Sequence, residues 1–384
     1  MKRMKAVMWM TRRDAVASST RRTLVTAMAV LILGCTGSSE PSPTPAEPSP
    51  TVDASTSASS PSPSPAITLR DFPPFPDQPF SERVAASLQG VIDEAAKEFG
   101  GISAGVIVGG AGHWSRAAGI AQGNLLTAGS ALQIASIGKT VTAAQVLRLV
   151  EEGAIGLDDP AADLLPPELT GYDANGATVR QLLGMRSGIE GPATYDAGAT
   201  LPELVEMLPE PAFPAGSSFS YANVNYVLLG SIIEHVTGRS LWEVLRSDVL
   251  HHPGLGRLRF PVRDALAADG SLVESDPASL ARWGYELYGG SVLTAASLRA
   301  MADFEDGFYG LGVFDMSSEN AFVDEGFGVP AIGHDGIGAG IASTLVAFPR
   351  TGEVVSVQAL GSDPNEHKRL IDDLLDVVRA AAIG

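Results

Sequence analysis

Residues 134–140 read IASIGKT and place the hydroxyl of Ser136 three positions before the amine of Lys139. Apolar residues then recur at three- and four-residue spacing until Gly153, a pattern typical of a helix. Positions i and i+3 share a helix face, so the Lys139 amine is expected beside the Ser136 hydroxyl. Free N–H groups and the positive dipole end of the first turn would also stabilise negative charge on an attacked substrate oxygen.

The Ser-x-x-Lys pattern is too short to define a site alone, because it arises roughly once by chance in a chain of this length. Two other motifs are excluded on local grounds. Residues 138–140 end like a phosphate-binding loop, but that loop needs a glycine where Gln133 stands. Residues 101–105 read GISAG like a nucleophile elbow, but Ser103 leads into a β-type run and not into a helix.

The composition is that of an acidic globular chain. Its 384 residues are 45% hydrophobic, which is ample for a core in one or two packed units. Asp and Glu number 44 against 26 Lys and Arg, for a formal net charge of −18. This excess of negative charge argues against nucleic acid and against an anionic membrane face as partners.

The single cysteine, Cys35, ends an apolar run over residues 23–34 that follows Arg21 and Arg22. A basic segment, an apolar segment and a small residue make a secretory signal. Residues 32–35 read ILGC and resemble a bacterial lipobox, in which the cysteine becomes the lipidated first residue of the mature protein.

We therefore predict a signal peptide over residues 1–34 and lipidation at Cys35. Residues 20–25 read TRRTLV and also resemble a twin-arginine export signal. The expected location is the outer face of the bacterial cell membrane, with the membrane contacted through the N-terminal lipid alone. The alternatives are simple secretion or an uncleaved anchor helix, although the apolar run is short for a membrane span.

Residues 35–75 are predicted to be a linker, because residues 36–67 are mostly Ser, Pro, Thr and Ala. Such a stretch buries too little apolar surface to offset its ordering entropy. One folded domain is expected over residues 76–384. The order of its elements predicts an α/β (α+β) fold, with one antiparallel sheet built from N- and C-terminal segments, flanking helices and a mostly helical inserted subdomain. The expected strands are 102–108, 114–121, 310–314, 331–334, 342–348 and 353–360, and the main expected helices are 81–99, 223–235, 241–249, 278–288 and 365–382.

Two further stretches carry polar groups in apolar or Gly-rich surroundings. Tyr221-Ala222-Asn223 opens a helix, and His334-Asp335-Gly336 lies beside a strand. With Ser136 and Lys139 they match, in order and spacing, the three motifs of the serine penicillin-recognising proteins. The chain thus resembles class C β-lactamases, D-alanyl-D-alanine carboxypeptidases and related esterases over about residues 80–384.

The resemblance implies an acyl-enzyme formed on Ser136, with Lys139 and Tyr221 both candidates for the group that takes the serine proton. It gives Asn223 a hydrogen bond to the substrate. The N–H groups of Ser136 and Ile337 would form the oxyanion hole. His334, which stands where many relatives have lysine, and Gly336 belong to the substrate-binding third motif.

No cofactor and no metal are expected, and the chain is expected to be a monomer. His251 and His252 precede a Pro-Gly turn, and no third metal ligand is spaced nearby.

Asp335 departs from the family pattern, which usually has threonine there to help hold a substrate carboxylate. A second carboxylate would repel a D-alanine terminus or a β-lactam carboxylate unless Asp335 points away or is protonated. The expected substrate is therefore a small peptide, a β-lactam or an ester. The leading interpretation is a carboxypeptidase-like or β-lactamase-like hydrolase, and the alternatives are an esterase that needs no substrate carboxylate and a non-catalytic sensor or binding protein.

Overall fold

The computed structural model describes residues 69, 72–192, 199–262, 264–304, 307–319, 324–338 and 340–383. Residues Pro61–Gly384 form one compact unit, which is the unit described below. The predicted signal peptide, Cys35 and most of the predicted linker lie outside the described residues. No helix in the described ranges is long and apolar enough to cross a membrane.

A seven-stranded antiparallel sheet has the strand order β3-β2-β1-β9-β8-β7-β6, and β4 and β5 form a separate two-stranded ribbon. The strands are β1 Gly101–Val108, β2 Gly112–Ala121, β3 Asn124–Leu125, β4 Leu132–Gln133, β5 Glu274–Ser275, β6 Phe314–Asp315, β7 Ile332–Gly338, β8 Ile341–Phe348 and β9 Glu353–Leu360. At the centre of the sheet, β1 pairs with β9, with Ile102 opposite Ala359. The predicted union of the N- and C-terminal segments in one sheet is confirmed.

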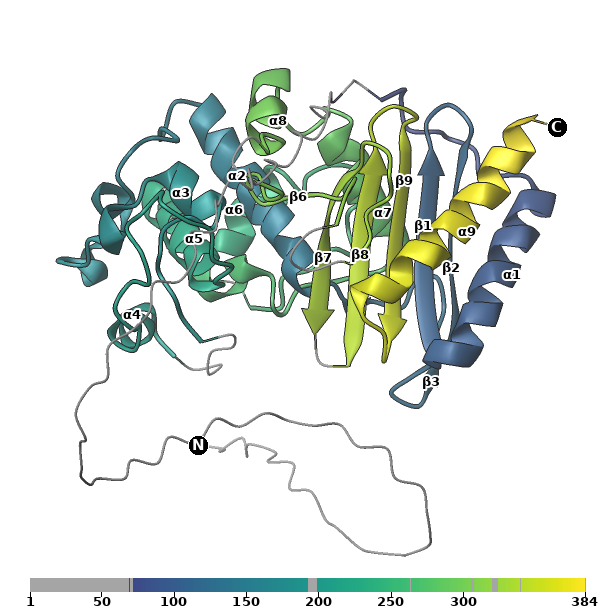
Figure 1. Cartoon of the computed structure of the whole chain (residues 1–384), viewed down its shortest axis with the longest axis horizontal. Helices are drawn as coiled ribbons and strands as arrows, with labels where there is room; N and C mark the ends of the chain where they lie inside the picture. The colour runs from purple at the N-terminus through teal and green to yellow at the C-terminus, as the bar shows by residue number, and fades with distance from the viewer. Residues whose placement is uncertain are drawn as a thin grey trace, which may run out of the picture. The chain divides into compact units, whose positions relative to one another are not determined.

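Helices cover both faces of this sheet (Figure 1). They are α1 Glu82–Phe99, α2 Gly138–Glu151, α3 Val179–Leu183, α4 Leu201–Glu206, α5 Val224–Thr237, α6 Leu241–Ser247, α7 Pro277–Tyr288, α8 Ala295–Met301 and α9 Pro364–Ile383. α1 and α9 lie side by side across one face, and α7 packs on the other face against β1, β8 and β9.

The sequence explains the helix α1 directly. Its N-cap Ser81 accepts a hydrogen bond from the N–H group of Val84, which satisfies a free donor of the first turn. Val84, Leu88 and Ile92 recur on one side and are buried. The predicted start and end of this helix are therefore confirmed to within one residue.

The helical subdomain is built around α5, which packs against α2, α3, α6 and the 3₁₀ helix Ala265–Asp269. All of its first ten residues are buried, which fits a helix enclosed on all sides. Gly238 ends α5 in the left-handed conformation, with φ of 65°. The predicted mostly helical insertion is confirmed.

Two local predictions are wrong in detail. Ser136 lies in a 3₁₀ turn, Ala135–Ile137, that precedes α2, and not in the first turn of the α-helix. The strand predicted over residues 310–314 shrinks to β6, because the N–H of Gly310 bonds the carbonyl of Val313 and closes a turn. Gly312 sits inside that turn at φ of 82°, a conformation that interrupts a strand.

The approach of α7 to β1 gives a test of the packing. A Cβ atom on Gly105 would collide with the carbonyl oxygen of Pro277, so Gly105→Ala should lower the free energy of unfolding by about 1–3 kcal/mol. Gly90 in α1 has open space around it, and Gly90→Ala should raise stability by about 0.5–1 kcal/mol. Urea unfolding of the full chain measures both, and equal stability of Gly105→Ala and the parent would contradict the close packing.

Candidate active site

The turn that carries Ser136 is held by backbone contacts from a distant segment. The N–H of Ile134 donates to the carbonyl of Val273 at 2.8 Å, and the Gln133 side chain donates to the carbonyl of Ser271 at 2.7 Å. Ala135 takes a left-handed conformation with φ of 45°, which is uncommon for a residue with a side chain. Such strained positions persist where the surrounding structure fixes them, and the residue that follows this one is the predicted nucleophile.

Lys139 is completely buried, and its amine faces Ser136. Lys139 Nζ donates to Ser136 Oγ at 2.9 Å and to the backbone carbonyl of Asp269 at 2.6 Å. Burial lowers the pKa of Lys139 to about 8, because an ammonium loses its hydration there, and the negative charge of Asp269 opposes that shift. A fraction of the amine is therefore neutral near pH 7 and able to accept a proton from the serine.

Tyr221 lies beside this pair, three residues before α5 begins. Its hydroxyl oxygen is buried, and its ring centroid is 5.1 Å from Lys139 Nζ. Burial raises the pKa of Tyr221 well above its usual value, and its hydrogen bond with Ser136 offsets only part of this rise. Tyr221 therefore keeps its proton in the resting protein, and of the two candidate bases Lys139 has the pKa nearer to neutrality.

The strand β7 brings the third motif to the same place. A Cβ atom on Gly336 would collide with the carbonyl oxygen of Ile134, so only a glycine allows the strand to approach the Ser136 turn this closely. The hydroxyl of Ser343 on β8 donates to the same carbonyl at 2.9 Å. The sequence motifs around Ser136 and Gly336 are thus brought together in the structure.

His334 is buried and neutral. Its Nδ1 lies 2.6 Å from the carbonyl oxygen of Asp335 and carries the proton, so Nε2 accepts from the hydroxyl of Tyr309 at 3.3 Å. Burial and the charge of Lys139 lower the pKa of His334 to about 3. This histidine therefore does not supply the positive charge that a lysine would supply at the same position.

Asn223 and Ile337 are the other two predicted substrate-binding and oxyanion residues that the structure describes. Asn223 precedes the first residue of α5, two positions after Tyr221, and its Oδ1 atom is buried. Ile337 follows Gly336 near the end of β7, with a side chain that is 68% exposed. The remaining predicted site residue, Cys35, lies outside the described residues.

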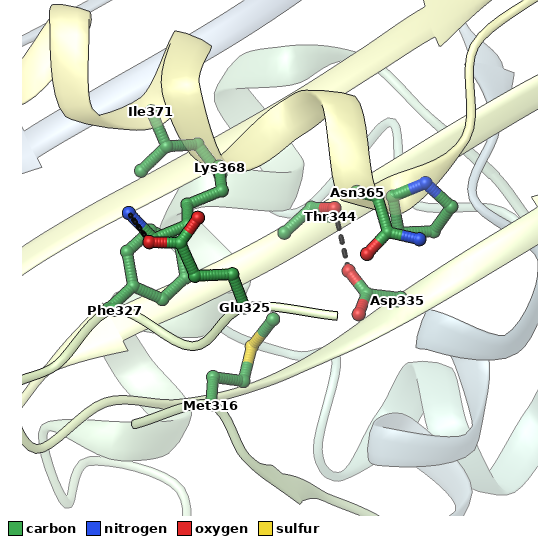
Figure 2. Close-up of a pocket in the computed structure, with 9 residues that line it drawn as sticks. Met316, Glu325, Phe327, Asp335, Thr344, Asn365, Lys368 and Ile371 are labelled. Atoms are coloured by element: carbon green, nitrogen blue, oxygen red, sulfur yellow. Dashed lines mark hydrogen bonds and ion pairs between the residues drawn. The ribbon is translucent and has the colours of Figure 1, made fainter. Parts of the chain in front are cut away.

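Asp335 points away from the face of β7 that His334 occupies. Its Oδ1 accepts a hydrogen bond of 2.6 Å from the hydroxyl of Thr344, its partner on β8 (Figure 2). Thr344 contacts Nδ1 of His367 on α9 at 2.9 Å, and His367 Nε2 lies 2.9 Å from the hydroxyl of Ser362. Of the two conditions under which Asp335 would not repel a substrate carboxylate, the structure meets the first, because this side chain belongs to the interface with α9.

Aromatic residues that the motifs did not indicate line the His334 side of the site. The ring centroid of Phe314 lies 4.6 Å from that of His334 and 4.8 Å from that of Tyr309. The ring of Tyr309 also meets the ring of Tyr221 edge-on at 5.9 Å. In the sequence these residues looked like ordinary apolar positions, and no local pattern marked them as site residues.

The part of the chain that the structure describes contains no group of three or more His, Cys, Asp or Glu side chains placed to hold a metal ion. The arrangement consists of a serine hydroxyl, a buried amine and a buried phenol within contact of one another. The serine hydroxyl therefore lies beside an amine that can accept its proton.

Comparison with known proteins identifies the family. The family model described as Beta-lactamase matches residues 88–379, so the chain belongs to the β-lactamase family of serine hydrolases. Penicillin-binding protein 4 of Amycolatopsis lactamdurans is 30% identical over 286 residues, which are 62% of this chain and 74% of that protein.

Two solved structures are similar in fold. The D-stereospecific amidohydrolase from Streptomyces sp. is 25% identical with a TM-score of 0.57, covering 76% of this chain and 97% of its own. The D-amino acid amidase from Ochrobactrum anthropi SV3, complexed with L-phenylalanine, is 22% identical with a TM-score of 0.61, covering 78% of this chain and 100% of its own. The second likeness shows the fold alone.

The position of Asp335 predicts a pH-dependent stability. Burial raises the pKa of Asp335 from its usual 3.8 to about 7, so the folded protein keeps this proton to higher pH than the unfolded chain does. The protonated Asp335 carboxyl makes its full contribution to the free energy of unfolding below its unfolded pKa of 3.8. This contribution is lost as the pH rises toward the folded pKa of about 7. Asp335→Asn, which does not titrate, should therefore gain stability relative to the parent by about 1–3 kcal/mol between about pH 4.5 and pH 8.

Urea unfolding of both proteins at the two pH values measures this difference. His367, whose pKa burial lowers to about 4, is present in both proteins, so its own titration largely cancels. A difference that stays constant with pH would show that Asp335 is not a buried, protonated carboxyl.

Proposed function

We propose that this chain is an exported serine hydrolase that cleaves amide bonds through an acyl-enzyme on Ser136. The observation that carries the proposal is the 2.9 Å contact between the completely buried Lys139 amine and the Ser136 hydroxyl. Burying a lysine amine costs free energy, and buried lysines with a lowered pKa are found at catalytic sites, where such an amine serves as a base. The contact also favours an enzyme over the non-catalytic sensor, which would not need it.

In the proposed reaction, the neutral fraction of Lys139 takes the Ser136 proton while the serine oxygen bonds to the substrate carbonyl carbon. The N–H groups of Ser136 and Ile337 stabilise the oxyanion, and Asn223 binds the substrate. Tyr221, which keeps its proton at rest, donates it to the leaving nitrogen as the scissile bond breaks and regains one from Lys139. In the second half of the reaction, water gives a proton to the neutral Lys139 amine and bonds to the acyl carbon. The ester bond to Ser136 Oγ then breaks, and Lys139 returns the proton to that oxygen.

Substrates that contain D-amino acids are the proposed class. The supporting observations are the family membership, the relative named as a penicillin-binding protein and the fold-level similarity to an amidohydrolase named as D-stereospecific. D-alanyl peptides and β-lactams are the first members of this class to consider.

A second candidate is a hydrolase whose amide or ester substrates carry no carboxylate beside the scissile bond. The neutral state of His334 favours it, since a neutral imidazole gives little attraction to a substrate carboxylate. Asp335 does not decide between the two candidates, because its side chain is hydrogen-bonded toward α9.

The test is the intact mass of the full chain after exposure to benzylpenicillin and, separately, to a fluorophosphonate. The parent should gain one adduct with the fluorophosphonate, and Ser136→Ala should gain none. Equal labelling of both proteins would refute the assignment of Ser136 as nucleophile. A penicilloyl adduct on the parent supports the first candidate, whereas fluorophosphonate labelling without a penicilloyl adduct supports the second.

We also propose that Cys35 is lipidated and holds the protein at the outer face of the cell membrane. The lipobox-like residues 32–35 support this proposal. Cys35→Ala, expressed in a bacterium that processes lipoproteins, should move the protein from the membrane fraction to the soluble fraction. Retention in the membrane would point to an uncleaved anchor helix instead.

A further inference from the structure

Asp269 is a buried acidic residue next to the site, and neither the sequence motifs nor the reaction proposed above assigns it a role. It ends the 3₁₀ helix Ala265–Asp269, and its exposed fraction is 0%. Its backbone carbonyl accepts the 2.6 Å hydrogen bond from Lys139 Nζ. The side chain of the residue that positions the lysine is therefore itself an ionisable group.

The two carboxylate oxygens of Asp269 have different surroundings. Oδ1 accepts a hydrogen bond of 2.9 Å from the N–H of Ser271 and so caps the turn that follows. Oδ2 is buried and has no hydrogen-bond partner among the described residues. Burying a carboxylate oxygen without a hydrogen bond costs free energy unless a positive charge lies nearby.

Lys139 is the buried cation that hydrogen-bonds the backbone carbonyl of the same residue. The negative charge of Asp269 favours the cationic form of Lys139, against the effect of burial, and it also raises the pKa of Tyr221. The other titratable groups that face Lys139 are Tyr221, Tyr226 and His334. Burial keeps all three neutral near pH 7. The negative charge of Asp335, on the far face of β7, raises the pKa of Tyr221.

We propose that Asp269 is a positioning residue for Lys139, and that its buried carboxylate stabilises the lysine cation formed when Ser136 gives up its proton. The proposal rests on the proposed role of Ser136 as nucleophile. A carboxylate that favours the cation makes the neutral amine a stronger base, and it also reduces the neutral fraction at a given pH. Asp269 thus acts on the serine only through the lysine.

The backbone around Asp269 explains why its carboxylate stays in place. Gly270 has φ of 82°, and a Cβ atom there would lie 2.5 Å from the carbonyl oxygen of Ala135, so this loop lies directly on the nucleophile turn. The N–H of Val273 bonds the carbonyl of Gly270 at 3.0 Å and closes the loop. An Asp269 side chain that only capped the turn would make the same contacts. The experiment must therefore detect the loss of its negative charge.

The variant Asp269→Asn keeps an oxygen that can accept the Ser271 hydrogen bond but removes the negative charge. Asp264→Asn is the matched control. Asp264 also caps a turn, since its Oδ1 accepts from the N–H of Leu266 at 3.1 Å, but it is exposed. The rate of fluorophosphonate labelling of Ser136 in the full chain, followed by intact mass between about pH 5 and pH 10, gives the profile for each protein.

We expect the profile of Asp269→Asn to move to lower pH by roughly one unit, because Lys139 loses the charge that favours its cation. Its maximal rate should also fall, because the amine is a weaker base. Asp264→Asn should match the parent. If Asp269→Asn folds poorly, Asp269→Ser tests the same point, since a serine hydroxyl can also cap the turn.

A profile of Asp269→Asn at the same pH as that of the parent would overturn the proposal, even if the overall rate or stability changed. Failure of the proposed function gives a different result. In that case the parent is not labelled at all, or it is labelled no more than Ser136→Ala.

Discussion

A fully buried lysine amine that donates to a serine hydroxyl is the interaction on which the rest of this structure depends. Removing an ammonium group from water costs several kcal/mol unless protein groups replace its hydration. Here Ser136 Oγ and the Asp269 carbonyl accept its hydrogen bonds, and the rings of Tyr221 and Tyr226 lie within 6 Å. The helix α2, which carries Lys139, is enclosed by α5 and by the 3₁₀ helix that ends at Asp269. The inserted helical subdomain thus keeps water away from the amine.

Glycines let distant backbone segments converge on that lysine and serine. Gly270 meets the carbonyl of Ala135, Gly336 meets the carbonyl of Ile134, and Gly312 lies against Ala143 and Tyr226. At each position a side chain would separate two segments that are far apart in the sequence. The site is thus assembled from close backbone contacts as well as from its polar side chains. These backbone contacts fix the conformation of the turn that carries Ser136.

The sequence predicted the features that depend on local spacing. The helix α1 carries a regular apolar repeat, α5 is rich in apolar residues, and the motifs at Ser136, Tyr221 and Gly336 are short enough to read directly. Residues whose role depends on distant neighbours could not be predicted. Asp269 resembles any loop aspartate until the fold buries it, and the direction of Asp335 depends on Thr344 and α9. The neutral state of His334 likewise follows from burial, which a motif does not record.

The pairing of β1 with β9 has a consequence for how the protein forms. Ile102 and Ala359 lie opposite each other in the sheet although most of the domain separates them in the sequence. Contacts of such high sequence separation slow folding, because the loop between them must close before the contacts can stabilise it. The central strand pair therefore cannot form until the last part of the chain has been synthesised. The turn that carries Ser136 packs against β7 of the same sheet, since Gly336 meets the carbonyl of Ile134, so these contacts also form only after the C-terminal strands are available.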